Sequence, residues 1–170
     1  MQPVRLISRL DTKTDQLIKG IHLEGWRKLG DASEFCKKYY SEGVDEILLI
    51  DSVASLYNRD KLLKVIEKIA SNVFVPITVG GGIKNCDDAY ELFKSGADKI
   101  AINTGAILNP KIIEEISKNF GAQSLVLSIQ AKKEGDLKWR CYYDAGREKS
   151  NLFRPLFLIV CRIITLTKLF

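Results

Sequence analysis

The sequence has little of what metal sites and catalytic triads require. It holds one histidine, His22, and its cysteines form no Cys-x-x-Cys pair. Zinc and thiol-redox sites need closely spaced ligands, so we expect no metal and no cofactor. A Ser-His-Asp or Cys-His catalytic group would depend on His22 alone. We interpret the cysteines as reduced, mostly buried small apolar residues. They are Cys36, Cys86, Cys141 and Cys161.

Long apolar runs are also missing. No stretch approaches the roughly 18 uninterrupted apolar residues of a membrane helix, and residues 1–10 lack the basic-then-apolar pattern of a secretory signal. With 170 residues, 46% apolar and 28% charged, the composition is that of a folded soluble domain. A disordered, collagen-like or disulfide-stapled chain is excluded, and we expect a cytoplasmic protein with no membrane span.

Acidic residues are absent from the last 20 positions, which carry three of the five net positive charges. Residues 1–150 are therefore left with a net charge of only +2. Nucleic-acid binding needs a basic cluster interleaved with aromatic residues. No such cluster precedes the tail, so we predict no nucleic-acid partner.

Alternating strands and helices are indicated by an apolar period that switches between two or continuous and about 3.6. The strand candidates are short and nearly continuous in Val, Ile and Leu, as buried parallel strands are. They are Val4–Ser8, Glu46–Asp51, Ile77–Val79, Lys99–Asn103 and Leu125–Gln130. The helix candidates are Ala32–Glu42 with an Asp31 cap, Lys61–Ser71, Cys86–Lys94 and a fourth opening with Asn109 and Pro110. Gly43, Gly96 and Gly121 follow three of them, where a left-handed residue is favoured. This order predicts an α/β barrel or a doubly wound sheet.

Chemistry is expected at the carboxyl ends of these strands, because strand-to-helix loops gather there in both architectures. Asp11 and Asp51, at the first two strand ends, are either acid/base groups or caps of their own loops. Three consecutive glycines, residues 80–82, follow the third strand. They either cradle a phosphate with their N–H groups or form a tight turn that needs positive φ.

Five segments, in this order, resemble the cyclase subunit of imidazole glycerol phosphate synthase. They are Leu10-Asp11-Thr12-Lys13, residues 17–20 (LIKG), residues 49–51 (LID), residues 77–83 (ITVGGGI) and residues 96–104 (GADKIAINT). The resemblance runs from residue 1 to about residue 149. It implies a (βα)8 TIM-type barrel, of which residues 1–150 are about the N-terminal half, with five strands and four helices. Residues 151–170 form an apolar tail of unknown structure that replaces the expected continuation.

The resemblance also implies roles for individual residues at the carboxyl ends of the strands. Asp11 is the acid/base group, while Lys19 and Asp51 contact substrate from the loops. Substrate phosphate is expected at Gly81, Gly82, Asn103 and Thr104.

At the opposite, amino-terminal ends of the strands lie Arg5, Glu46 and Lys99. A charge inside a barrel is costly unless it is paired, so these three are expected to form a salt-bridged ring. In the family such a ring gates the entry of ammonia, and Asp98 nearby is expected to meet the glutaminase partner. An ordinary surface ion-pair cluster is the alternative.

The chain departs from the family pattern at residue 130 and again near residue 150, where the resemblance ends. The second acidic catalytic residue of the family is replaced by Gln130, which keeps the hydrogen-bonding shape but does not exchange a proton. Residues 21–25 and 53–57 are more similar to a paralogous branch associated with surface-polysaccharide genes, where the ammonia is thought to serve amidation of a nucleotide-activated sugar. His22 is either a loop contact of that branch or an ordinary surface residue.

The leading hypothesis is therefore an ammonia-accepting subunit that works with a glutaminase on a phosphorylated sugar or ribonucleotide, with sugar amidation slightly favoured over histidine biosynthesis. A phosphate-binding half-barrel without turnover is the first alternative, and an inactive fragment is the second. Half a barrel leaves the outer strands open, so pairing of two copies into a homodimer is a further possibility.

Overall fold

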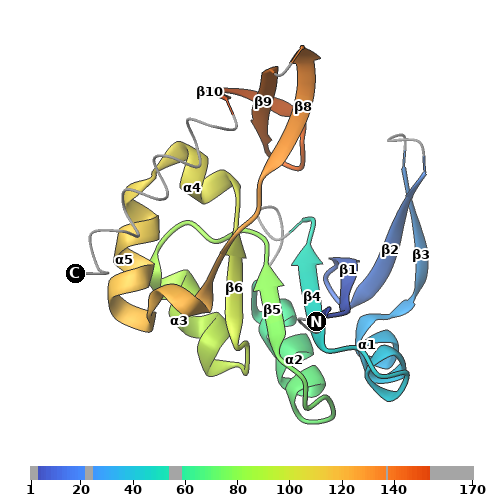
Figure 1. Ribbon diagram of the computed structural model, residues 1–170. Helices are drawn as coiled ribbons and strands as arrows, with labels where there is room; N and C mark the ends of the chain where they lie inside the picture. The colour runs from blue at the N-terminus through green and yellow to red at the C-terminus, as the bar shows by residue number, and fades with distance from the viewer. Residues whose placement is uncertain (1–3, 22–24, 54–58, 137, 154–170) are drawn as a thin grey trace. The chain divides into compact units, whose positions relative to one another are not determined.

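The computed structural model describes residues 4–21, 25–53, 59–136 and 138–153. The chain divides into two compact units (Figure 1). The first comprises residues 1–82 and 87–100, and the second comprises residues 83–86 and 101–170. Within the described residues, no helix is long and apolar enough to cross a membrane.

The first unit carries a sheet with the strand order β3-β2-β1-β4-β5-β6. Its strands are β1 (Ile7–Lys13), β2 (Gln16–Ile21), β3 (Gly25–Asp31), β4 (Glu46–Asp51), β5 (Ile77–Gly80) and β6 (Lys99–Ile102), which continues into the second unit. Its helices are α1 (Ala32–Ser41), α2 (Arg59–Ala70) and nearly all of α3 (Cys86–Lys94). The pairs β1–β4 and β4–β5 are parallel, whereas β2 and β3 form an antiparallel hairpin beside β1.

The core of this unit lies on one face of the parallel strands. Leu10, Leu49 and Val79 stand in register across β1, β4 and β5, and all three are buried. Cys36 of α1 and Ile66 of α2 are also fully buried. Successive side chains of a strand point to opposite faces of the sheet. The opposite face of β1 and β4 therefore carries the alternate residues, which begin with Ile7 and Glu46.

Helix α1 begins at the cap that the sequence predicts. The Asp31 carboxylate accepts hydrogen bonds from the backbone N–H groups of Ser33 (2.8 Å) and Glu34 (3.2 Å). The hydroxyl of Ser33 also donates to Asp31 and is the main reason that the pKa of this carboxyl lies below its usual value. Behind the cap, burial and then the charge of Asp31 raise the pKa of Cys36 to about 12, so this thiol stays protonated at neutral pH.

The second unit begins with the end of β6 and contains helices, a short strand and a separate meander. Its elements are α4 (Thr104–Leu108), α5 (Lys111–Phe120), a 3-10 turn (Ala122–Ser124), β7 (Leu125–Leu127), β8 (Gln130–Gly135), β9 (Lys138–Tyr143) and β10 (Glu148–Phe153). Strand β7 lies beside β6, and β8, β9 and β10 form an antiparallel sheet in the order β10-β9-β8. Three isoleucines of α5 are buried: Ile112, Ile113 and Ile116.

The expected α/β class with parallel strands alternating with helices is confirmed, and it is consistent with part of a (βα)8 barrel. The bounds of β4 and α3 agree with the prediction, and Gly43, Gly96 and Gly121 have φ of 89°, 108° and 89°. The first strand was misplaced: it is Ile7–Lys13, because its last two residues pair with β2 and extend it. The fifth expected strand ends early, at Leu127.

The sequence did not predict the hairpin β2–β3, the helix α4 or the meander β8–β10. The fourth expected helix begins one residue later than predicted, since Pro110 is its cap and Lys111 its first residue. Strand β10 continues across residue 150, where the tail was expected to begin, as far as Phe153. Residues 154–170 and His22 lie outside the described residues.

Gly81 provides a test of how closely β4 and β5 approach each other. Its φ is +118°, and a Cβ added there would lie 2.3 Å from the backbone oxygen of Asp51. We therefore expect Gly81→Ala to lower the free energy of unfolding by about 2 kcal/mol or more, measured by urea denaturation. The matched control is Gly20→Ala, since a Cβ at Gly20 meets nothing within 4 Å; it should change stability by less than about 0.5 kcal/mol. Equal effects of the two substitutions would contradict the close approach.

Candidate functional site

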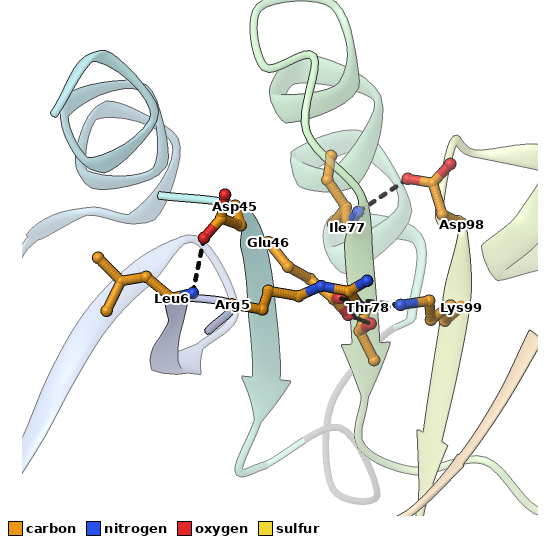
Figure 2. A network of polar contacts seen from close by, with 8 residues as sticks. All are labelled: Arg5, Leu6, Asp45, Glu46, Ile77, Thr78, Asp98 and Lys99. Carbon is orange, nitrogen blue, oxygen red and sulfur yellow. Dashed lines mark hydrogen bonds and ion pairs between the residues drawn. The ribbon is translucent and has the colours of Figure 1, made fainter. Parts of the chain in front are cut away.

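A buried carboxylate at the amino-terminal end of β4 is the centre of a polar cluster in the first unit (Figure 2). Glu46 is only 4% exposed. Its Oε2 lies 2.8 Å from Lys99 Nζ and 3.1 Å from Arg5 Nη1. Its Oε1 accepts hydrogen bonds from the Thr78 hydroxyl at 2.7 Å and from Lys99 at 2.9 Å. Arg5, Lys99 and Thr78 therefore all contact the carboxylate of Glu46.

The electrostatics of this cluster keep Glu46 ionised. Burial by itself raises the pKa of a carboxyl, because it removes water from the charged form. In Glu46 the hydrogen bonds from Lys99 and Thr78 and the charges of Lys99 and Arg5 outweigh burial, so its pKa lies below the usual value. Two cations face one carboxylate, and the cluster carries a net positive charge.

Thr78 is the member of the cluster that sequence reasoning missed. All four residues of β5 are buried, and Thr78 is the one with a polar side chain. A hydroxyl group in a buried strand needs a hydrogen-bond partner. A threonine in this apolar segment was therefore the sequence signal that could have predicted a polar contact. Here the partner is Glu46, which lies across the strand pair.

The repeat of Gly-x-Asp-x-Ile at residues 43–47 and 96–100 has a structural explanation in the same region. Asp45 accepts a hydrogen bond from the N–H of Leu6 (2.7 Å) and donates its own N–H to the Leu6 oxygen (2.9 Å). Asp98 makes the same pair of bonds with Ile77, again at 2.7 and 2.9 Å. Figure 2 shows the bond from the Ile77 N–H to the Asp98 carboxylate. Each aspartate thus ties its strand to the start of the neighbouring one and fixes the position of the residue that follows it.

The carboxyl ends of β1 and β4 hold two aspartates in different surroundings. Asp11 lies within β1, is 41% exposed at its side chain, and accepts hydrogen bonds from Arg9 at 2.9 and 3.1 Å. Asp51 is buried and accepts a hydrogen bond from the N–H of Val53 at 2.9 Å. Asp51 pairs with Thr12, the residue after Asp11, so the two aspartates point to opposite faces of the sheet.

Three other residues with predicted substrate roles also lie in the first unit. Gly81 and Gly82 have φ of +118° and +64°. A tight turn, the alternative interpretation of the three glycines, requires such positive φ angles. Lys19 lies on β2, is exposed, and stands opposite Arg27 of β3. Neither Lys19 nor Arg27 forms an ion pair with another described residue. The contacts of Gly81, Gly82 and Lys19 with substrate stay predictions.

In the second unit, Asn103 and Thr104 follow β6 and Gln130 begins β8. The Asn103 amide nitrogen donates to the backbone oxygens of Ser128 (2.8 Å) and Tyr142 (3.3 Å). Thr104 Oγ1 accepts a hydrogen bond from the N–H of Asp144 at 3.1 Å. Asn103 Oδ1 and Gln130 Oε1 are buried, and no described residue donates to either. The Asn103 side chain therefore presents an acceptor, not a donor.

Acidic, cysteine and histidine side chains do not gather into a metal site anywhere in the described ranges. The cysteines with described positions are free: Cys36 and Cys141 are buried and Cys86 is half-buried.

Comparison with known proteins identifies the family. The model of the family described as "Histidine biosynthesis protein" matches residues 5–154, and the chain belongs to this family of TIM barrels. The chain is 50% identical over 152 residues to imidazole glycerol phosphate synthase subunit HisF of Legionella pneumophila, which covers 89% of this chain and 72% of that protein. It is 42% identical over 149 residues to the HisF subunit of Azobacteroides pseudotrichonymphae and 46% identical over 148 residues to that of Dictyoglomus thermophilum.

The chain spans 59% of the length of these last two relatives. These relatives are named as HisF subunits of imidazole glycerol phosphate synthase, and the matching family is described as a histidine biosynthesis protein. The comparisons thus favour the histidine-biosynthesis alternative over the preference for sugar amidation that residues 21–25 and 53–57 suggested.

The depressed pKa of Glu46 predicts how stability depends on pH. Because the folded-state pKa is below the unfolded value of about 4.3, the stabilisation is present above that value and is lost as the pH falls through the folded pKa. We expect the free energy of unfolding, from urea titrations, to fall between about pH 5 and pH 3, and to fall less steeply in Glu46→Gln. The exposed Glu67→Gln variant should keep the wild-type slope; an unchanged slope in Glu46→Gln would contradict the cluster's role.

Proposed function

We propose that the chain works as an ammonia-accepting subunit of the imidazole glycerol phosphate synthase type, together with a glutaminase of the HisH type. The observation that carries this proposal is the buried Glu46 with Lys99, Arg5 and Thr78 at the amino-terminal end of the parallel strands. Sequence identity of 42–50% to subunits named HisF supports it.

The chemistry of the cluster suits a passage for neutral ammonia. Two cations around one carboxylate repel the ammonium ion, whereas uncharged ammonia is not repelled. Lys99 donates to both oxygens of Glu46, and movement of the Lys99 side chain is the step that we propose admits ammonia. Asp98, exposed next to Lys99, is the proposed contact for the glutaminase.

The carboxyl ends of the strands are proposed to hold the substrate. In the first unit Asp11 supplies the acid/base group, with Arg9 orienting its carboxylate. Lys19 and Asp51, which were expected on loops, contribute from strand β2 and from the end of strand β4. The phosphate-binding residues are Gly81 and Gly82 in this unit and Asn103 and Thr104 in the second. Since Asn103 offers an acceptor oxygen, the backbone N–H groups of residues 103 and 104 are the better phosphate donors there.

Gln130 supports a second candidate, a phosphate-binding protein of the same family without turnover. An amide neither gives nor takes a proton at useful pH, so chemistry that needs two carboxylic groups would rest on Asp11 alone. This candidate keeps the phosphate residues and the ion-pair cluster but predicts no product.

The test compares two nitrogen sources. The chain is incubated with a HisH-type glutaminase and the synthase's ribonucleotide substrate, and imidazole glycerol phosphate is measured with either glutamine or ammonium chloride. We expect product from both sources, and we expect Lys99→Met to lower the glutamine-dependent rate by about fivefold or more while the ammonium-dependent rate is retained.

Lys94→Met, which removes an exposed lysine of α3 in the same unit, is the matched control and should leave both rates unchanged. Absence of product with ammonium chloride would reject the enzymatic proposal in favour of the binding protein. Equal loss of both rates in Lys99→Met would reject the ammonia-passage role of the cluster.

A further inference from the structure

Two buried amide oxygens of the second unit are left without a hydrogen-bond donor. One is Asn103 Oδ1, at the carboxyl end of β6, and the other is Gln130 Oε1, at the start of β8. Among the residues that the structure describes, none donates to either atom. Buried polar atoms are nearly always partnered, because leaving one unpaired destabilises the fold. The second unit therefore holds two buried acceptors to which a donor from outside the described chain could bind.

The two amides belong to one neighbourhood. The Asn103 amide nitrogen donates to the oxygens of Ser128 and Tyr142. Tyr142 is the cross-strand partner of Gln130 in the β8–β9 pair, and Ser128 precedes Gln130 by two residues. The amide nitrogen of Asn103 is therefore bound to the segment just before Gln130 and to the strand that pairs with Gln130.

The orientation of the Asn103 amide is fixed by the same bonds. Exchanging its oxygen and nitrogen would place Oδ1 against two backbone oxygens and would lose both hydrogen bonds. Asn103 therefore presents an acceptor in the folded chain.

Gly146, in the turn between β9 and β10, lies near the side chain of Gln130. Its φ is +80°, and a Cβ added to it would lie 3.4 Å from Gln130 Oε1. A contact of this length is ordinary van der Waals contact, so the turn between β9 and β10 lies beside the Gln130 oxygen without crowding it.

We propose that Asn103 Oδ1 and Gln130 Oε1 bind N–H or O–H donor groups of a ligand, and that these two side chains do not bind phosphate. Phosphate oxygens are acceptors and would face two further acceptors, whereas an ammonium nitrogen or a sugar hydroxyl supplies the missing hydrogen. The inference rests on the proposed function, whose ligands include both a nitrogen source and a hydroxyl-bearing substrate. It assigns to Gln130 a binding role that does not require a titratable group.

Gln130→Met tests this assignment, because methionine keeps the length of the side chain and removes the unpartnered oxygen. Removal of an unpaired buried acceptor should raise the melting temperature of the ligand-free chain by about 2–4 °C. The same change should weaken binding of a donor ligand by roughly three- to tenfold, the effect of one neutral hydrogen bond. The exposed Gln123→Met variant of the same unit is the matched control and should alter neither quantity.

Thermal unfolding and titration calorimetry are carried out on the full chain with three probes: ammonium chloride against sodium chloride at equal ionic strength, ribose 5-phosphate, and inorganic phosphate. A response to ammonium that falls in Gln130→Met identifies the donor as nitrogen. A response to ribose 5-phosphate that falls in Gln130→Met, with the phosphate response unchanged, identifies hydroxyl groups.

Three results would overturn the proposal: no response to ammonium or ribose 5-phosphate, equal responses in wild type and Gln130→Met, or a lower melting temperature of ligand-free Gln130→Met. All three are binding or stability results. They are therefore separable from failure of the proposed function, which is an absence of product.

Discussion

The buried carboxylate of Glu46 imposes the constraint around which the first unit is organised. A charge removed from water is strongly destabilising unless it is paired and hydrogen-bonded, and Glu46 is 4% exposed. Its partners come from three other places in the chain: Arg5 before β1, Thr78 on β5 and Lys99 at the start of β6. The carboxylate is satisfied only when the amino ends of these strands meet in one register.

The aspartates of the internal repeat set that register. Asp45 and Asp98 each make a reciprocal pair of hydrogen bonds with the start of the adjacent strand, and the next residue in each copy is a member of the cluster. The same register places Asp11 beside Ile50 and brings Gly81 against the backbone of Asp51 at the carboxyl ends. The ion pairs at one end of the strands and the candidate catalytic groups at the other are thus positioned by a single set of strand pairings.

The sequence predicted the elements whose apolar residues are either periodic or nearly continuous, and it missed the elements whose apolar residues are neither. The strand β4 was found because its residues are apolar and buried almost throughout. In the hairpin β2–β3 and the meander β8–β10, adjacent buried residues such as Leu17 and Ile18 are followed by exposed polar residues, so neither a period of two nor a continuous apolar run marks these strands. Arg5, Glu46 and Lys99 were predictable from their positions at strand starts. The acceptor orientation of Asn103 was not, because it depends on which backbone oxygens lie beside the amide.

A double-mutant cycle between Glu46 and Lys99 tests the central claim most directly. The free energies of unfolding of the wild type, Glu46→Gln, Lys99→Met and the double variant are measured by urea denaturation at pH 7. A buried carboxylate held by a lysine through both oxygens predicts a coupling energy of about 1.5–3 kcal/mol. A coupling energy within about 0.5 kcal/mol of zero would mean that the two residues contribute independently, and it would contradict the account.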